Sequence, residues 1–231
     1  MESDRFGKLG GKSYEFFRKV FPHHDNFQEM VGLILKYYST RKLNRVLDIG
    51  CGTGYTTEEI IKCGTKHVDA VDTSPIMLDK MKKWVKKFKL QKRVTLYKEF
   101  DYDKNKNVYD AVISVLTLHN LAEKERDALT IKMCQTVAPK GIIIIGDKLG
   151  IGKKDLDKRA LAFRIKHVVG GLESLGKKKL SREWRKHYKM DERPGRKFFE
   201  SHLIKLLKKQ GFVTSVHYRL HQEAIVLGIK K

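Results

Sequence analysis

The sequence lacks several features that would place the protein outside the ordinary globular class. It has no apolar run of about 18 residues, the length that a membrane-spanning helix requires. Residues 1–4 do not begin the basic-then-apolar pattern of a signal peptide. There is also no internal repeat and no low-complexity linker. We therefore expect a cytoplasmic protein with no membrane partner.

Cysteine is scarce as well. The three cysteines, Cys51, Cys63 and Cys134, are far apart in the chain and odd in number. They form neither the paired spacing of a metal site nor an evident disulfide framework. The sequence thus predicts no metal site, and it fits a reducing compartment such as the cytoplasm.

Acidic residues are few beside basic ones. The chain has 27 Asp and Glu against 49 Lys and Arg, for a formal net charge of +22. Such an excess is typical of proteins that bind a polyanion, and RNA is the leading candidate. It also occurs where lysines merely solvate the surface, and here Lys far outnumbers Arg, which specific nucleic-acid recognition more often uses. Both interpretations stay open.

The hydrophobic pattern indicates one α/β domain over residues 1–231. Hydrophobic residues make up 41% of the 231 residues, enough for a substantial core. Strands are predicted at 45–49, 68–71, 94–97, 109–116 and 142–145, and helices at 25–38, 55–62, 75–88 and 123–137, with a turn at 139–141. Strands that alternate with helices predict a parallel sheet with right-handed crossovers.

The last third of the chain departs from this alternation. Residues 148–200 are rich in Lys and Arg and helical in pattern, with Gly170-Gly171 and Gly176 as expected interruptions. We expect a helical insertion over the sheet edge. A helix at 198–210 and strands at 212–220 and 223–229 follow, and strands so close in sequence form an antiparallel hairpin. Residues 1–40 are predicted as N-terminal lid helices.

A glycine-rich turn, Gly50 to Gly54, follows the first strand. Glycines let the backbone approach a ligand closely, and the next helix offers free N–H groups and its positive dipole end. Dinucleotide-binding proteins use a similar turn. An NAD-dependent dehydrogenase, however, would have a third glycine at the helix start, where Thr56 and Thr57 stand.

Two acids accompany this turn. Asp48 interrupts an otherwise apolar strand, so it needs a partner such as a ligand ammonium or local N–H groups. Asp72 ends the second strand, where a carboxylate can accept both ribose hydroxyls of an adenosine. Alternatively, Asp72 only caps the helix that begins after Ser74.

Four segments resemble the ordered motifs of class I S-adenosylmethionine (SAM)-dependent methyltransferases. They are residues 46–54, 70–78, 109–114 running into Leu118-His119, and 139–142. The resemblance covers about residues 30–150. It implies SAM as cofactor and a Rossmann-like doubly wound sheet, mostly parallel, with a C-terminal antiparallel hairpin and a helical insertion or lid.

The resemblance also implies roles for single residues. The glycines would wrap the methionine moiety, Asp72 would hold the ribose and Met77 would pack on the adenine. Asp101, with Glu99 close behind, is favoured for the adenine amino group, although the loop after it is shorter and more polar than usual. The full predicted cofactor set is Asp48, Gly50, Cys51, Gly52, Thr53, Gly54, Asp72, Thr73, Met77, Glu99, Phe100, Asp101 and Ser114.

Three residues are candidates for catalysis. His119 should lie beside the sulfonium, and His24 and Tyr14 belong to the stretch that resembles the lid of small-molecule methyltransferases. Each also has a plain alternative: a ring stacked near the cofactor for His119, and surface helix residues for the other two. Methyl transfer needs a base only when the acceptor must lose a proton.

The acceptor stays open at this stage. A small molecule is favoured, because no recognisable RNA-binding domain is present; an RNA (tRNA) methyltransferase is the alternative suggested by charge. The order of insertion, helix and hairpin also resembles carboxy-SAM synthase in layout. A non-catalytic SAM-binding protein is the remaining hypothesis.

Overall fold

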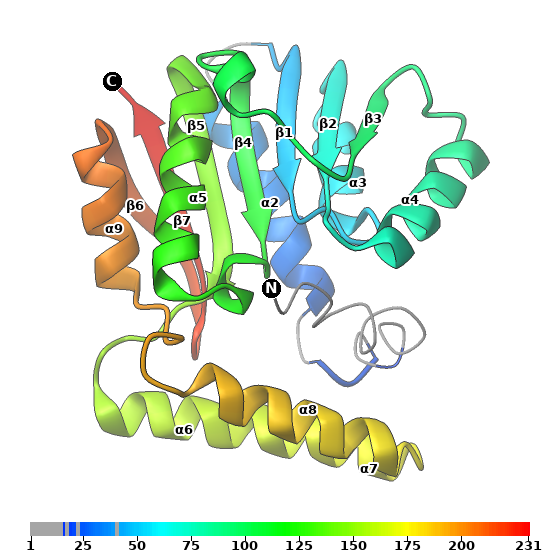
Figure 1. Cartoon of the computed structure of the whole chain (residues 1–231), viewed down its shortest axis with the longest axis vertical. Coiled ribbons are helices and arrows are strands. Elements are labelled where there is room, and N and C mark those ends of the chain that lie inside the picture. The colour runs from blue at the N-terminus through cyan, green and yellow to red at the C-terminus, as the bar shows by residue number, and fades with distance from the viewer. Residues whose placement is uncertain (1–15, 17–18, 22–23, 40–41) are drawn as a thin grey trace.

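The protein was analysed as a computed structural model, which describes residues 16, 19–21, 24–39 and 42–231. One seven-stranded mixed sheet runs through it in the order β3-β2-β1-β4-β5-β7-β6 (Figure 1). The strands are β1 (Arg45–Ile49), β2 (His67–Val71), β3 (Val94–Tyr97), β4 (Tyr109–Val115), β5 (Val137–Lys148), β6 (Phe212–Leu220) and β7 (Glu223–Lys230). This order confirms the predicted doubly wound sheet.

Five of the strands are parallel. β1 pairs in parallel with both β2 and β4, and Asp48 lies opposite Ala70 on one side and Ile113 on the other. β4 has no exposed residue, because both faces of a parallel sheet are covered by helices. The C-terminal strands are antiparallel: β7 pairs with β5 and β6, which confirms the predicted hairpin.

Helices cover both faces of the sheet. Alternate strand residues point to opposite faces, so Val46 packs with α2 (His24–Tyr38), α3 (Tyr55–Lys62) and α4 (Pro75–Lys87). Its neighbour Leu47 packs instead with α5 (Glu123–Thr136) and α9 (Glu200–Lys209). The short η1 (Asp103–Asn105) and η2 (Leu118–Asn120) are 3₁₀ turns that precede and follow β4.

The predicted insertion forms a layer of its own. It comprises α6 (Lys154–Arg164), a π-helical segment η3 (Ile165–Val169), α7 (Gly170–Ser174) and α8 (Lys178–Asp191). In Figure 1, α6 and α8 both lie across the lower end of the sheet, the end toward which β4 points. A separate apolar cluster that includes Phe21, Leu172 and Trp184 holds this layer together.

Two local predictions were wrong. The chain stays helical through Gly170-Gly171. Gly171 allows close packing rather than a break in the helix, because an added Cβ would lie 2.9 Å from Val20. The expected turn at 139–141 is part of β5, which starts at Val137; the extra residues are taken up by a register shift against β4. Lys140 adopts a φ of 60° there. Gly176, in contrast, does end a helix, with a φ of 70°.

Two findings bear on the compositional predictions. Among the described residues, no helix is both long and apolar enough to cross a bilayer. Cys51, Cys63 and Cys134 are all free thiols.

Candidate functional site

The carboxyl ends of β1, β2 and β4 meet at one edge of the sheet. In a doubly wound sheet this is where ligands bind, at the point where the strand order reverses between β1 and β4. The segments that follow these strands carry the glycine turn, Asp72 and η2 with His119. The structure therefore brings three of the four motifs to one edge of the sheet, while residues 139–142 lie beside the start of β4.

The glycine turn adopts conformations that favour glycine. Gly50, Gly52 and Gly54 have φ values of 74°, 54° and 101°. An added Cβ on Gly50 would lie 2.1 Å from the Thr117 hydroxyl, so this glycine is needed for the close approach of the loop after β4. At Gly52 the same Cβ would meet no described atom within 4 Å. The turn is thus anchored at its start and open at its middle.

Asp72 closes onto this turn. Its Oδ2 accepts the backbone N–H of Gly52 at 2.9 Å, and its Oδ1 accepts that of Ser74 at 2.8 Å. Burial nevertheless raises the pKa of this carboxyl, with the two N–H donors acting in the opposite direction. Each oxygen keeps a further lone pair. Asp72 is therefore both a local structural acceptor and a free acceptor for a ligand hydroxyl.

Asp48 is buried beneath the turn. Its Oδ2 accepts the hydroxyl of Thr57 at 2.5 Å, while its Oδ1 has no hydrogen-bond partner among the described residues. Burial is the main cause that raises the pKa of Asp48 to about 7; the Thr57 bond opposes it and the charge of Asp72 adds to it. A buried carboxylate oxygen without a partner fits a ligand cation.

The remaining predicted contacts of the turn differ in burial. Cys51 and Met77 are buried, Thr53 is half-buried and Thr73 is exposed. The Thr53 hydroxyl is enclosed and has no hydrogen-bond partner within the described chain. The roles of these four residues as ligand contacts remain predictions.

The segment after β3 makes its contacts mainly with neighbouring residues of the chain. Glu99 is exposed, and Phe100 packs edge-on against Tyr97 and Tyr102. Asp101 is exposed, and the backbone N–H of Lys104 lowers the pKa of its carboxyl more than any other group does. No finding brings Asp101 or Glu99 to a nucleoside, so the adenine contact remains a prediction.

On β4, Ser114 is fully buried, and its hydroxyl donates to the carbonyl of Ile49 at 3.1 Å. Its side chain therefore joins β4 to β1 rather than facing solvent. Of the two lid candidates, Tyr14 lies outside the described residues, and His24 is the first residue of α2, where its side chain is not described.

His119 forms a buried dyad with Asp147, a residue that sequence reasoning missed. Nδ1 of His119 lies 2.5 Å from Oδ1 of Asp147, and the backbone N–H groups of Leu118 and His119 donate to Oδ2 at 2.8 and 3.2 Å. Burial alone would raise the pKa of Asp147, but His119 and these donors outweigh it and hold the pKa below its ordinary value. An ionised carboxylate only accepts, so Nδ1 carries the proton.

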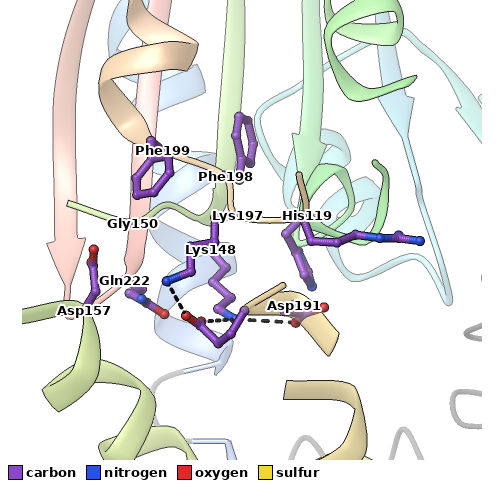
Figure 2. Close-up of a pocket in the computed structure, with 11 residues that line it drawn as sticks. His119, Lys148, Gly150, Asp157, Asp191, Lys197, Phe198, Phe199 and Gln222 are labelled. Carbon is purple, nitrogen blue, oxygen red and sulfur yellow. Dashed lines mark hydrogen bonds and ion pairs between the residues drawn. The ribbon is translucent and has the colours of Figure 1, made fainter. Parts of the chain in front are cut away.

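Beyond this dyad, charged side chains line the junction of sheet and insertion (Figure 2). Lys148, at the end of β5, is buried with its Nζ 3.5 Å from Asp191 and 3.4 Å from Glu192. Burial and the charge of Arg164 lower the pKa of Lys148. Arg164 itself forms a buried ion pair with Glu223.

Two adjoining cavities lie at this junction. The inner one, about 20 Å³, is lined by His119, Lys148 and Asp191 among others, which is room for about one water molecule. The outer one, about 310 Å³, is lined by Gly152, Lys154, Asp157, Lys158, Leu161, Glu192, Lys197 and Phe199. Asp157, Glu192, Lys197 and Phe199 line both.

Comparison with known proteins agrees with this geometry. A family model described as a methyltransferase domain matches residues 46–141, which hold β1 to β4, the glycine turn and both acids. Within residues 46–141 the chain therefore matches a methyltransferase domain. The expected family resemblance is thereby confirmed.

Two groups of curated proteins are similar to the chain. The carboxy-S-adenosyl-L-methionine synthase of Citrobacter koseri is 24% identical over 156 residues, covering 66% of this chain and 62% of that protein. An uncharacterised methyltransferase of Oceanobacillus iheyensis is 25% identical over 134 residues, covering 58% and 57%. The chain thus spans about three fifths of the length of these relatives.

Solved structures share the fold. Magnesium protoporphyrin IX methyltransferase from Synechocystis, solved with bound S-adenosylhomocysteine, superposes with a TM-score of 0.65 at 17% identity and covers 99% of this chain and 98% of its own. The YcgJ protein of Bacillus subtilis gives 0.59 at 13% identity, covering 90% and 99%. The methyltransferase-type sheet therefore extends over the C-terminal hairpin, beyond the family match.

Proposed function

We propose that the chain binds SAM over the carboxyl ends of β1 and β2 and transfers its methyl group to a small molecule. The observation that carries the proposal is the pairing of an open glycine turn with two acids that still have acceptor capacity. Gly52 leaves space for a ligand, Asp72 has free lone pairs, and Asp48 has a buried oxygen with no described partner.

Each of these groups suits one part of the cofactor. Ribose hydroxyls would donate to Asp72, and the ammonium of the methionine moiety would meet Oδ1 of Asp48, directly or through a water. The ammonium would also offset the cost of a buried carboxylate. SAM supplies an electrophilic methyl group on a sulfonium, so the chain's own contribution is to hold and orient the two reactants.

Orientation is a sufficient role for the protein in such a displacement. Holding two reactants in line is worth on the order of 7–11 kcal/mol in favourable cases. The leaving thioether needs no acid. A base is required only for an acceptor that loses a proton, and His119 stays the candidate for that step.

The outer cavity is the proposed acceptor site. About 310 Å³ is within the range of small-molecule pockets, at their lower limit. Its lining combines Leu161 and Phe199 with Lys154, Lys158 and Lys197, which suits a small amphipathic anion. The inner cavity links it to His119 through shared lining residues.

A second candidate function is favoured by the relatives, several of which are carboxy-SAM synthases. The two activities differ in what becomes of SAM. Mass spectrometry of the nucleoside separates them after incubation with SAM and a small-molecule extract that supplies methyl acceptors and carboxyl donors. Methyl transfer leaves S-adenosylhomocysteine, a synthase leaves carboxylated SAM, and a non-catalytic binder leaves SAM unchanged.

An RNA acceptor is the alternative that charge supports. A tRNA mobility-shift assay at increasing salt should then show a steep loss of affinity. Failure to bind tRNA at low salt would leave the charge as a surface property. We further propose a single domain and a cytoplasmic location without a membrane partner; the free cysteines are consistent with that compartment.

The direct test of the main proposal is calorimetric titration with SAM and with NAD. We expect binding of SAM alone. Asp72→Ala should weaken SAM binding at least tenfold, because a hydrogen bond to a charged group contributes about 1.5–3 kcal/mol. NAD binding, or unchanged SAM affinity in Asp72→Ala, would contradict the proposed site. Asp79→Ala, an exposed acid on α4, is the matched control.

A further inference from the structure

Three metal-ligating side chains from two distant segments meet beneath the insertion. His119 comes from η2, and His187 and Asp191 come from α8. One ligand atom of each lies within 4.8 Å of the others, and all three residues are buried. The sequence predicted no metal site from its cysteine spacing, and nothing in the order of the chain indicates that η2 meets α8.

The pair on α8 already has the geometry of metal ligands. His187 and Asp191 are four residues apart and so share one face of the helix. Nε2 of His187 lies 3.5 Å from Oδ2 of Asp191. Two ligand atoms bound tetrahedrally to zinc at 2.0–2.1 Å are about 3.3 Å apart. The two atoms therefore need to move little to bind one ion.

His119 is oriented for the same role. In the neutral imidazole the proton on Nδ1 faces the carboxylate of Asp147, which leaves Nε2 with a lone pair. A carboxylate that holds the second ring nitrogen is the usual support of a metal-binding histidine. Figure 2 shows the imidazole of His119 pointing toward the carboxylate of Asp191.

Carboxylates lie next to the three ligands. Asp147 is buried behind His119, and Asp191 contacts the buried Lys148, whose Nζ also lies 3.4 Å from the half-buried Glu192. An ion at Asp191 would replace the 3.5 Å contact with Lys148, which keeps its contact with Glu192.

We propose that His119, His187 and Asp191 bind one divalent transition-metal ion, for which two imidazoles and a carboxylate match the ligand preference of Zn²⁺. The inner cavity is lined by His119 and Asp191, and it has room for a water as the fourth ligand. In the metal-loaded protein His119 acts as a ligand rather than as a proton acceptor. None of the three ligands belongs to the predicted cofactor set, so zinc binding and SAM binding can be measured separately.

The test uses the full chain, stripped with a chelator and titrated calorimetrically with Zn²⁺ alone. We expect one equivalent to bind, and X-ray absorption at the zinc edge should show nitrogen and oxygen ligands with imidazole scattering. His187→Asn and Asp191→Asn should each weaken binding by at least the 10- to 100-fold that even an outer-shell residue costs. SAM titration of the same samples keeps this result separate from the proposed methyl transfer.

His202→Asn is the matched control. His202 belongs to a more exposed group with Glu123 and Asp127, and its Nε2 already lies 2.8 Å from Asp127. Its substitution should leave zinc affinity unchanged. Absence of zinc binding, a sulfur-containing ligand sphere, or full affinity in a folded His187→Asn protein would overturn the proposal. The absorption spectrum of the unmutated protein decides the question even if the buried variants fail to fold.

Discussion

Replacing Asp48 by Asn should remove the pH dependence that this buried acid imposes on stability. Burial raises its pKa to about 7, against about 3.9 in an unfolded chain. Between these values the folded protein holds a proton that the unfolded chain has released. The stability that this proton provides is complete below about pH 4 and is lost as pH rises through about 7.

The magnitude follows from the size of the shift. Three units at 1.36 kcal/mol each come to about 4 kcal/mol. Asn keeps an oxygen that can accept the Thr57 hydroxyl but has no charge to bury. The stability difference between variant and unmodified protein should therefore change by up to about 4 kcal/mol between pH 4 and pH 8, in favour of the variant.

Urea unfolding across this pH range measures the difference directly, with the exposed Asp79→Asn as control. SAM should stabilise the unmodified protein more at pH 8 than at pH 5, because an ammonium favours the charged carboxylate. Asp48→Asn should lose most of that gain. Parallel pH profiles for the two proteins would refute both the buried charge and its role toward the ligand.

Two further substitutions probe the site and its support. Gly50→Ala should lower the free energy of unfolding in urea clearly more than Gly52→Ala does, because the new Cβ at position 50 would clash with Thr117. At position 52 the substitution adds only a backbone strain of about 1–2 kcal/mol. Gly52→Ala should instead lower SAM affinity in calorimetry, and equal effects at both positions would contradict the open middle of the turn. Glu223→Gln should destabilise the fold by about 3–5 kcal/mol, because it leaves Arg164 buried without its carboxylate. The double change Glu223→Leu with Arg164→Met should restore part of that loss, and no recovery would show that the pair is not the cause.

Much of the sheet could be predicted because its signals are local. A strand such as Tyr109–Val115 is apolar throughout, and the turn after β1 is rich in glycine. Asp48 and Asp72 stand out because acids are costly at the ends of buried strands. The carboxyl ends of parallel strands then converge by topology alone, so these residues could be placed together without coordinates.

The dyad and the charged network could not be predicted in this way. Asp147 and Lys148 lie past the predicted end of the fifth strand, and composition alone assigned Lys148 to the insertion. The position of Asp191 against Lys148 depends on how α8 packs on the sheet. Gly171 was misinterpreted for a related reason, because its contact with Val20 is tertiary and leaves no local signal.

The way the insertion is attached argues that its contact with the sheet serves binding more than stability. Within the insertion, Trp184 and Tyr188 pack in an apolar cluster. Toward β5, the same helix α8 presents His187 and Asp191 to a lysine and a histidine. Buried ion pairs often contribute no more stability than apolar contacts of the same volume. Polar groups that converge beside a cavity at the carboxyl edge of the sheet are instead what a site for a charged ligand requires.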